Sequence, residues 1–165
     1  MAKADYTENR PSRMTRRAFG LGAAAVVVGG GGVFAARWYN ITARAGTDGT
    51  MSAPDVYKAA QSGEVLLIDI RRPEEWQRTG VGEGAVTLDM RRDDFTEALL
   101  VQTGGRKDMP VALICARGVR SRGLAARLTS AGFNNVIDVP EGMLGSGAGP
   151  GWLKRELPTV AWVAG

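Results

Sequence analysis

The sequence predicts an α/β domain with a mainly parallel central sheet. Two uninterrupted apolar runs of strand length, at residues 64–70 and 110–114, are typical of strands that are covered on both faces. Segments with helical periodicity separate the predicted strands, and this alternation indicates helices that cross over between parallel strands. A length of 165 residues suits one domain of this kind together with a leader.

The first half of the predicted domain follows a short linker at 46–49. Ser52 is a suitable helix cap, Pro54 fits the first turn of that helix, and Gly63 ends it. Pro73 opens a second, shorter helix in the same way. In order, we expect a helix from residue 52, a strand at 64–70, a helix at 71–78, a loop at 80–84 and a strand at 85–88.

The second half contains the only cysteine of the chain. Apolar residues with helical spacing after Cys115 predict a helix that ends at Gly132, and Pro158 closes a last helical turn. The glycine-rich stretch at 142–151 is expected to be irregular. In order, we expect a helix at 91–101, a strand at 110–114, a helix at 121–131, a strand at 135–139 and a helical turn at 152–156.

The formal charge of +4 does not come from the predicted domain. Residues 1–45 hold seven basic and two acidic residues, whereas residues 46–165 hold fourteen basic and fifteen acidic ones. A near-neutral domain without a basic stripe argues against a nucleic-acid partner. The absence of histidine excludes Cys-His, Ser-His and His-ligated zinc chemistry, and a lone cysteine excludes an intrachain disulfide. We therefore expect neither a metal nor a cofactor.

The first 45 residues have the layout of a targeting peptide. Residues 15–21 read Thr-Arg-Arg-Ala-Phe-Gly-Leu, and an uncharged run rich in Ala, Val and Gly extends over 18–36. The paired arginines, with a Phe two residues further on, resemble a twin-arginine export signal. A small-x-small site ends at Ala45, which would allow cleavage before Gly46.

The same run also suits an uncleaved membrane anchor. Its nineteen residues would span about 28 Å as a helix, close to the thickness of a hydrocarbon core. Cleavage at Ala45 and retention as an anchor therefore both stay open. In either case the sequence predicts export by the twin-arginine translocase to the bacterial periplasm, with the domain at 46–165 on the periplasmic side of any tether.

The cysteine lies where a buried strand ends and a helix begins. Residues 115–121 read Cys-Ala-Arg-Gly-Val-Arg-Ser, directly after the apolar run. Backbone N–H groups converge at such a turn, and the helix N-terminus adds partial positive charge, so the site favours a thiolate. Arg117 and Arg120 offer positive charge to an anionic substrate. The competing interpretations are a buried, inert thiol for Cys115 and a solvated charge for Arg117.

Three segments carry a resemblance to a known family. Residues 67–76, Leu-Ile-Asp-Ile-Arg-Arg-Pro-Glu-Glu-Trp, are similar to an Asp-x-Arg-x-Pro-x-Glu-aromatic segment. Residues 80–86 stand in the place of a Gly-His-Ile-Pro-Gly-Ala motif, and residues 115–121 are similar to an active-site loop, Cys-x-x-Gly-x-Arg-Ser. Together and in this order, they resemble the rhodanese-like sulfurtransferases over roughly residues 50–160.

The resemblance implies a rhodanese-like three-layer fold, with a central, mainly parallel five-stranded sheet and helices on both faces. It implies a sulfurtransferase that takes a sulfane sulfur from a small anionic donor such as thiosulfate and holds it as a persulfide on Cys115. The acceptor would be a thiol, a cyanide-like molecule or an exported protein. The substrate-binding residues would be those of the loop: Ala116, Arg117, Gly118, Val119, Arg120 and Ser121.

The resemblance also assigns supporting roles and shows departures. Asp69 and Arg71 would support the site, and we expect Arg71 to pair with one of the two glutamates at 74 and 75. Val81 stands where the family has His, Glu83 where it has Pro, and Glu141 where it has the first glycine of a pair. The glycine-rich stretch is longer than usual and is expected to border the mouth of the site.

Other functions fit parts of this pattern. A Cys-dependent phosphatase or arsenate reductase uses Cys-x5-Arg, but here the residue six after Cys115 is Ser121, and Arg120 is only five on. The shorter loop favours a sulfur atom over phosphate. A non-catalytic sulfur carrier or partner-binding module fits the same residues, whereas thiol–disulfide redox lacks a resolving cysteine.

Overall fold

The structure is a computed structural model and describes residues 49–164. The leader at 1–45, including its expected cleavage site, lies outside the described residues, so the export signal stays a prediction. Within the described part of the chain, no helix has the length and apolar character needed to cross a membrane.

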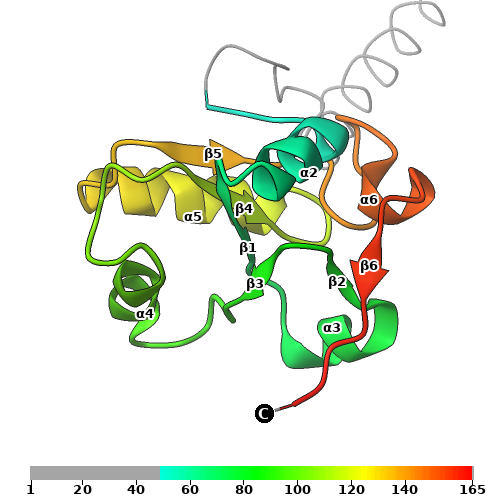
Figure 1. The fold of residues 1–165 in the computed structure, drawn as a ribbon, viewed down its shortest axis with the longest axis horizontal. Helices are drawn as coiled ribbons and strands as arrows, with labels where there is room; N and C mark the ends of the chain where they lie inside the picture. Colours follow the sequence, from blue (N-terminus) through cyan, green and yellow to red (C-terminus); the bar gives the residue numbers. More distant parts are fainter. Residues whose placement is uncertain (1–48, 165) are drawn as a thin grey trace, which may run out of the picture. The chain divides into compact units, whose positions relative to one another are not determined.

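Four parallel strands form the central sheet of the described region, in the order β3-β1-β4-β5 (Figure 1). Ile68 of β1 pairs with Val86 of β3 on one side and with Leu113 of β4 on the other, so β1 lies inside the sheet. This arrangement confirms the α/β class and the parallel sheet. The strands are β1 (Leu66–Asp69), β3 (Val86–Thr87), β4 (Val111–Ile114) and β5 (Val136–Asp138).

The central sheet of the described region has four strands instead of the expected five, and its edge beyond β5 carries only a single bridge. Thr50 forms a parallel bridge with Asp138 at the outer edge of β5. The N–H of Asp138 donates to Gly49 O at 2.8 Å, and its carbonyl accepts from Met51 N at 3.0 Å. The segment cannot lengthen into a strand because Ser52 already caps the following helix.

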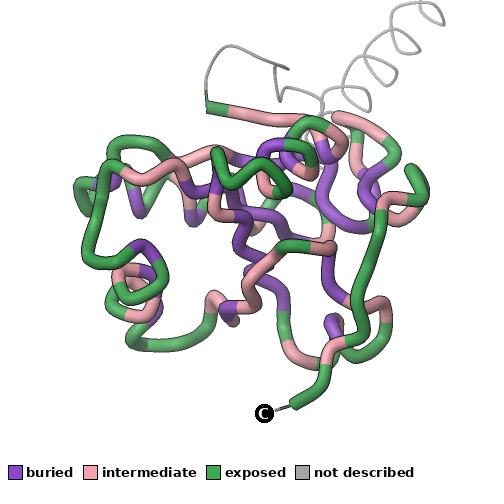
Figure 2. Tube along the Cα trace, in the orientation of Figure 1, coloured by how far each residue is buried: buried purple, intermediate pink, exposed green. Residues whose placement is uncertain are grey.

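Helices cover both faces of the sheet, which gives three layers (Figure 1). Side chains alternate along each strand, so Ile68 and Leu113 join one buried cluster, while Leu67 and Ala112 join the other. Figure 2 shows the central strands as buried, which explains why they read as continuous apolar runs. The first cluster lies under α4 (Phe95–Gln102) and α5 (Val119–Ser130), the second under α2 (Ala53–Gln61) and α6 (Gly151–Lys154).

The expected helix at 91–101 begins four residues late. Asp89 Oδ1 accepts a hydrogen bond from Arg91 N at 2.9 Å, and Arg92 pairs with Asp94 two residues further on. Such local side-chain bonds hold the backbone in turns and compete with a helix. Helix α4 therefore starts only at Phe95, whose ring is buried under the sheet.

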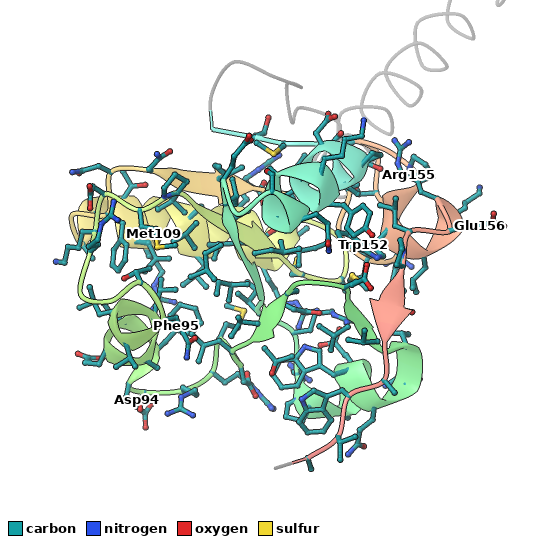
Figure 3. The ribbon with its side chains drawn as sticks, viewed as in Figure 1. Asp94, Phe95, Met109, Trp152, Arg155 and Glu156 are labelled. Atoms are coloured by element: carbon teal, nitrogen blue, oxygen red, sulfur yellow. The ribbon has the colours of Figure 1, made fainter. Side chains whose placement is uncertain are left out.

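A second, two-stranded sheet was not predicted. β2 (Val81–Gly82) pairs in antiparallel fashion with β6 (Thr159–Val160), whereas the sequence predicted a loop at 80–84 and no strand after Pro158. Trp152, labelled in Figure 3, packs against the two-stranded sheet. Its indole N–H donates to Pro158 O at 2.9 Å, and a Cβ on Gly82 would lie 2.8 Å from its ring. Glycine at 82 thus lets the two-stranded sheet lie against α6.

Candidate active site

The cysteine loop joins β4 to α5, as the sequence predicted. Cys115 follows β4 directly and is only 1% exposed. Gly118 has φ +78°, a left-handed conformation that suits glycine, and caps α5. Its N–H turns back and donates to Cys115 Sγ at 3.1 Å. Because of this tight turn, α5 begins at Val119, two residues earlier than expected.

Ser121 provides the second polar group beside the sulfur. Its side chain is fully buried, with Oγ 3.5 Å from Cys115 Sγ and 3.2 Å from Gly118 O. We expected the N–H groups of the whole loop to converge on the sulfur. Among the described residues, two groups donate hydrogen bonds to Sγ, the Gly118 N–H and the Ser121 hydroxyl. The other N–H groups of the loop do not.

Arg120 is held by a residue that the sequence did not link to it. Its two Nη atoms donate to the two carboxylate oxygens of Glu75, at 2.7 Å each. Glu75 lies in α3 (Pro73–Thr79). The hydrogen bonds from Arg120 lower the pKa of Glu75. Glu75 in turn raises the pKa of Arg120, and the Cys115 sulfur acts in the same direction, so the guanidinium of this loop keeps its positive charge.

Arg71 does not pair with Glu74 or Glu75, so that expectation was wrong. Its buried guanidinium binds the buried carboxylate of Asp69, with Nη2 to Oδ2 at 2.7 Å. Glu75 is occupied by Arg120, and Glu74 is exposed.

The remaining N–H groups of Arg71 hold the end of α3. Nη1 donates to Thr79 Oγ1 and Nη2 to Gly80 O, both at 2.7 Å. Asp69 and Arg71 therefore connect the end of β1 to the far end of the helix that carries Glu75. Through Glu75 they also support the position of Arg120.

The other loop residues form the rim. Arg117 is exposed, and its Nη1 lies 3.4 Å from Gly145 O; Val119 is 59% exposed. Ala116 is half-buried, and its carbonyl accepts from Leu144 N at 2.9 Å. The structure thus brings the polar groups of Gly118 and Ser121 to the sulfur and leaves Arg117 and Val119 outside.

The glycine-rich stretch packs against the loop from one side. Gly142 has φ +64°, and a Cβ there would lie 2.6 Å from Ala116 O. Glu141 is buried and accepts hydrogen bonds from Ala53 N at 3.3 Å, Gly151 N at 3.0 Å and Arg155 Nε at 2.7 Å. Arg155 is labelled beside α6 in Figure 3. The glutamate that replaces the family's glycine therefore ties the stretch to α2.

A further acid near the loop was missed by the sequence analysis. Asp138 ends β5, is 5% exposed, and neither of its side-chain oxygens has a hydrogen-bond partner. Burial raises its pKa to about 6, although the hydroxyl of Ser121 and the charge of Arg122 act to lower it. The only signal in the sequence is one acid in the apolar run Val-Ile-Asp-Val, and nothing local shows which way it faces.

No cluster in the described part of the chain offers three or more His, Cys, Asp or Glu side chains to a metal ion. The candidate site consists of a buried sulfur, two hydrogen-bond donors to it and an arginine of the same loop. Such surroundings stabilise a thiolate or a persulfide anion.

Comparisons with known proteins point to one family. Residues 52–146, more than half of the chain, match the model of the rhodanese-like domain. An uncharacterized protein of Rickettsia conorii is 26% identical over 99 residues, which cover 56% of this chain and 80% of that protein.

Two solved structures agree with this match. Rv0390 from M. tuberculosis is 26% identical, with a TM-score of 0.52, and the likeness covers 71% of this chain and 100% of that one. The polysulfide-sulfur transferase homodimer from Wolinella succinogenes is 25% identical, with a TM-score of 0.53, covering 67% of this chain and 77% of that one. The described region thus has the same α/β fold as these structures.

Proposed function

Because the chain belongs to the family of rhodanese-like domains, we propose that it is a sulfurtransferase that carries a sulfane sulfur as a persulfide on Cys115. One observation carries the proposal: the Gly118 N–H and the Ser121 hydroxyl meet at Cys115 Sγ, at 3.1 and 3.5 Å, where α5 begins. The resemblance to a protein named as a polysulfide-sulfur transferase supports it.

In the first step the Cys115 thiolate attacks the outer sulfur of a donor such as thiosulfate. A new S–S bond forms to Cys115, the S–S bond of the donor breaks, and sulfite leaves with the electron pair. The cation of Arg120 offsets the negative charge of the donor as it approaches. The Gly118 N–H and the Ser121 hydroxyl lie where they stabilise the sulfur anion before and after the transfer.

In the second step a nucleophilic acceptor attacks the terminal sulfur of the persulfide. The S–S bond to Cys115 breaks, the thiolate is restored, and cyanide, for example, leaves as thiocyanate. Cys115 is 1% exposed, so the acceptor has to reach the sulfur past the rim formed by Arg117 and Val119. A small thiophile meets this condition, as does a narrow side chain of an exported acceptor protein.

A phosphatase or arsenate reductase is a weaker candidate. Those enzymes surround a tetrahedral oxyanion with loop N–H groups and clamp it with an arginine six residues after the cysteine, whereas here the arginine is five residues on and the short loop directs the Gly118 N–H to the sulfur. A non-catalytic carrier or partner-binding module uses the same persulfide or the same surface without turnover. One experiment separates these candidates.

The test is intact mass spectrometry of the purified 165-residue chain after incubation with thiosulfate. We expect a reducible mass gain of one sulfur atom, absent in Cys115→Ser, followed by thiocyanate formation when cyanide is added. A persulfide that is released only to a protein acceptor would favour the carrier. Hydrolysis of aryl phosphates by a chain that takes up no sulfur would overturn the proposal.

We also propose that the protein acts in the bacterial periplasm, on the basis of the paired arginines at Arg16 and Arg17. The translocase that reads such signals exports folded cargo, which suits a domain whose thiol is already buried. Replacing both arginines by lysine should retain the protein in the cytoplasm. The mass of the exported protein would also show whether cleavage occurs after Ala45.

A further inference from the structure

Glu141 is a buried acid that takes no part in the two steps of the proposed transfer. Its Oε2 accepts from Arg155 Nε at 2.7 Å and from Gly151 N at 3.0 Å, and its Oε1 accepts from Arg155 Nη2 at 3.1 Å. The side chain of Glu141 is 3% exposed, whereas that of Arg155 is 33% exposed. The buried carboxylate thus depends for its charge partner on one arginine, which is labelled beside α6 in Figure 3.

Glu141 is the first of three consecutive acceptors for the N-terminal turn of α6. The N–H groups of residues 151, 152 and 153 donate, in this order, to the Glu141 carboxylate, to Gly142 O and to Met143 O, at 3.0 Å each. The first N–H groups of a helix have no partner within the helix, and here residues 141–143 satisfy them. The acid therefore helps to hold this segment against α6 in one register.

The same segment also holds the cysteine loop. Met143 N donates to Cys115 O, and Leu144 N donates to Ala116 O, both at 2.9 Å. Main-chain hydrogen bonds thus connect α6 to residues 142 and 143, and residues 143 and 144 to the loop. Glu141 is the point at which a side chain strengthens this connection.

These bonds determine which way two peptide units of the loop face. Within a trans peptide unit, C=O and N–H point in opposite directions. Because the carbonyls of Cys115 and Ala116 point toward residues 143 and 144, the N–H groups of Ala116 and Arg117 point away from them. Neither N–H has a hydrogen-bond partner among the described residues, so both can donate to an anion that approaches Cys115.

We propose that Glu141 and Arg155 are positioning residues for the cysteine loop, whose ion pair keeps the N–H groups of Ala116 and Arg117 turned toward anionic substrates. The pair acts through the main chain of residues 142–144 and not by contact with the donor. Without the pair, the segment can shift against α6, and the loop carbonyls lose their fixed partners. The inference rests on the proposed role of Cys115 and adds the residues that maintain the shape of its loop.

The test compares two alkylating reagents that differ in charge, iodoacetate and the neutral iodoacetamide, on the full 165-residue chain. Both react with the thiolate of Cys115, the only cysteine, so the ratio of their rates does not depend on how much thiolate is present. The ratio measures how well the loop receives an anion. In Glu141→Gln we expect the ratio to fall by roughly threefold to tenfold, while circular dichroism shows that the fold is retained.

The sign of the change separates positioning from a simple effect of charge. Glu141→Gln removes a negative charge, so the altered field alone would attract iodoacetate and raise the ratio. Arg155→Lys keeps the charge but loses the two-point geometry. The field alone would leave its ratio unchanged, whereas positioning predicts a fall. Because Arg155 is partly exposed, this variant also serves if Glu141→Gln does not fold.

The matched control is Tyr57→Phe, which removes a 2.7 Å hydrogen bond to Glu83 on the same face of the sheet. This variant should lose stability in urea unfolding without a change in the ratio. A ratio that is unchanged or raised in either Glu141→Gln or Arg155→Lys, once that variant is shown to be folded, would overturn the inference. An equal fall in Tyr57→Phe would overturn it as well.

Neither alkylation requires sulfur transfer. If thiosulfate leaves no persulfide on the wild-type protein, the proposed function fails, while the ratios still show whether Glu141 and Arg155 position the loop. If the persulfide forms but the ratios of wild type and variants coincide, the function stands and the role of the pair is lost.

Discussion

Arg120 and Glu75 form a two-point ion pair, with both guanidinium Nη atoms 2.7 Å from a carboxylate oxygen. The pair joins the first turn of α5 to α3 and is partly buried. A planar guanidinium bound at two points has one orientation, unlike a lysine ammonium in the same place. The position of the arginine beside the sulfur is therefore determined by a helix from another part of the chain.

Glu75→Gln should weaken sulfur transfer by roughly tenfold, because the amide accepts only one of the two bonds and Arg120 turns away from its present orientation. The loss of free energy of unfolding should be about 1 kcal/mol. Since the pair lowers the pKa of Glu75, this contribution is present above the usual carboxyl range and is lost as the pH falls through the lowered value. Glu74→Gln, at an exposed neighbour, is the control for steady-state kinetics, and an equal loss there would contradict the prediction.

Arg71→Met should destabilise the domain by roughly 3 to 5 kcal/mol, because it leaves the buried Asp69 carboxylate unpaired. Removing both charges, in Asp69→Leu with Arg71→Met, should cost less than the single change. Urea unfolding measures both effects. The comparison is Arg72→Met, whose side chain is 52% exposed, and a similar cost at that position would show that burial of the pair is not the cause.

Asp138→Asn should stabilise the protein at neutral pH and not in acid. The pKa is about 6 in the folded state and about 3.8 for an ordinary aspartate, so between these values the folded state keeps a proton that the unfolded chain has lost. The neutral carboxyl therefore costs nothing below the lower pKa. As the pH rises through the upper pKa, the wild type loses roughly 3 kcal/mol of its free energy of unfolding relative to its value in acid. Urea unfolding near the two ends of this range should show the difference between variant and wild type growing with pH. A difference in the free energy of unfolding that stays constant with pH would contradict this prediction.

Gly142→Ala should disturb the cysteine loop. Its φ of +64° already penalises a side chain by about 1 kcal/mol, and the new Cβ would lie 2.6 Å from Ala116 O, so that the backbone has to move. Gly104 has the same φ of +64° with no atom within 4 Å of a Cβ, which makes Gly104→Ala a matched control for strain alone. We expect slower alkylation of Cys115 in the first variant only.

Arg117→Ala should raise the KM for thiosulfate by roughly threefold to tenfold with little change in kcat, because an exposed cation attracts the anion but does not touch the reacting sulfur. Added salt should reduce the difference between variant and wild type. Arg127→Ala, an exposed cation near the end of α5, serves as the control. A fall in kcat without a change in KM would place Arg117 in the chemical step instead.

The sequence predicted those parts of the fold that local patterns encode. β1 and β4 are recognisable because both of their faces are buried, and Ser52 and Pro73 mark helix starts by their own chemistry. β2 and β6 were missed because each has two residues and the pairing joins Val81 to Val160 across most of the domain. No window of sequence contains that information.

Some residues of the candidate site could likewise be predicted from the sequence, and others could not. The loop from Cys115 to Ser121 was predictable because its residues are contiguous and their chemistry is local. Glu75 lies in α3 and Asp138 in β5. The sequence does not show how far from the cysteine loop these two side chains lie, or in which direction they point. Arg71 was expected to use a neighbouring glutamate, but its guanidinium binds Asp69, the last residue of β1, and no local pattern distinguishes these partners.

Glu141 has a consequence for how this protein can vary among its relatives. A Cβ on Gly149 would lie 2.5 Å from the Glu141 carboxyl, and Gly151 N donates to the same carboxyl. The acid therefore requires glycine at 149, and a relative with a smaller residue at 141 would have room for a side chain there. Position 151 would still require glycine, because its φ is +84° and a Cβ would meet the backbone of Gly145.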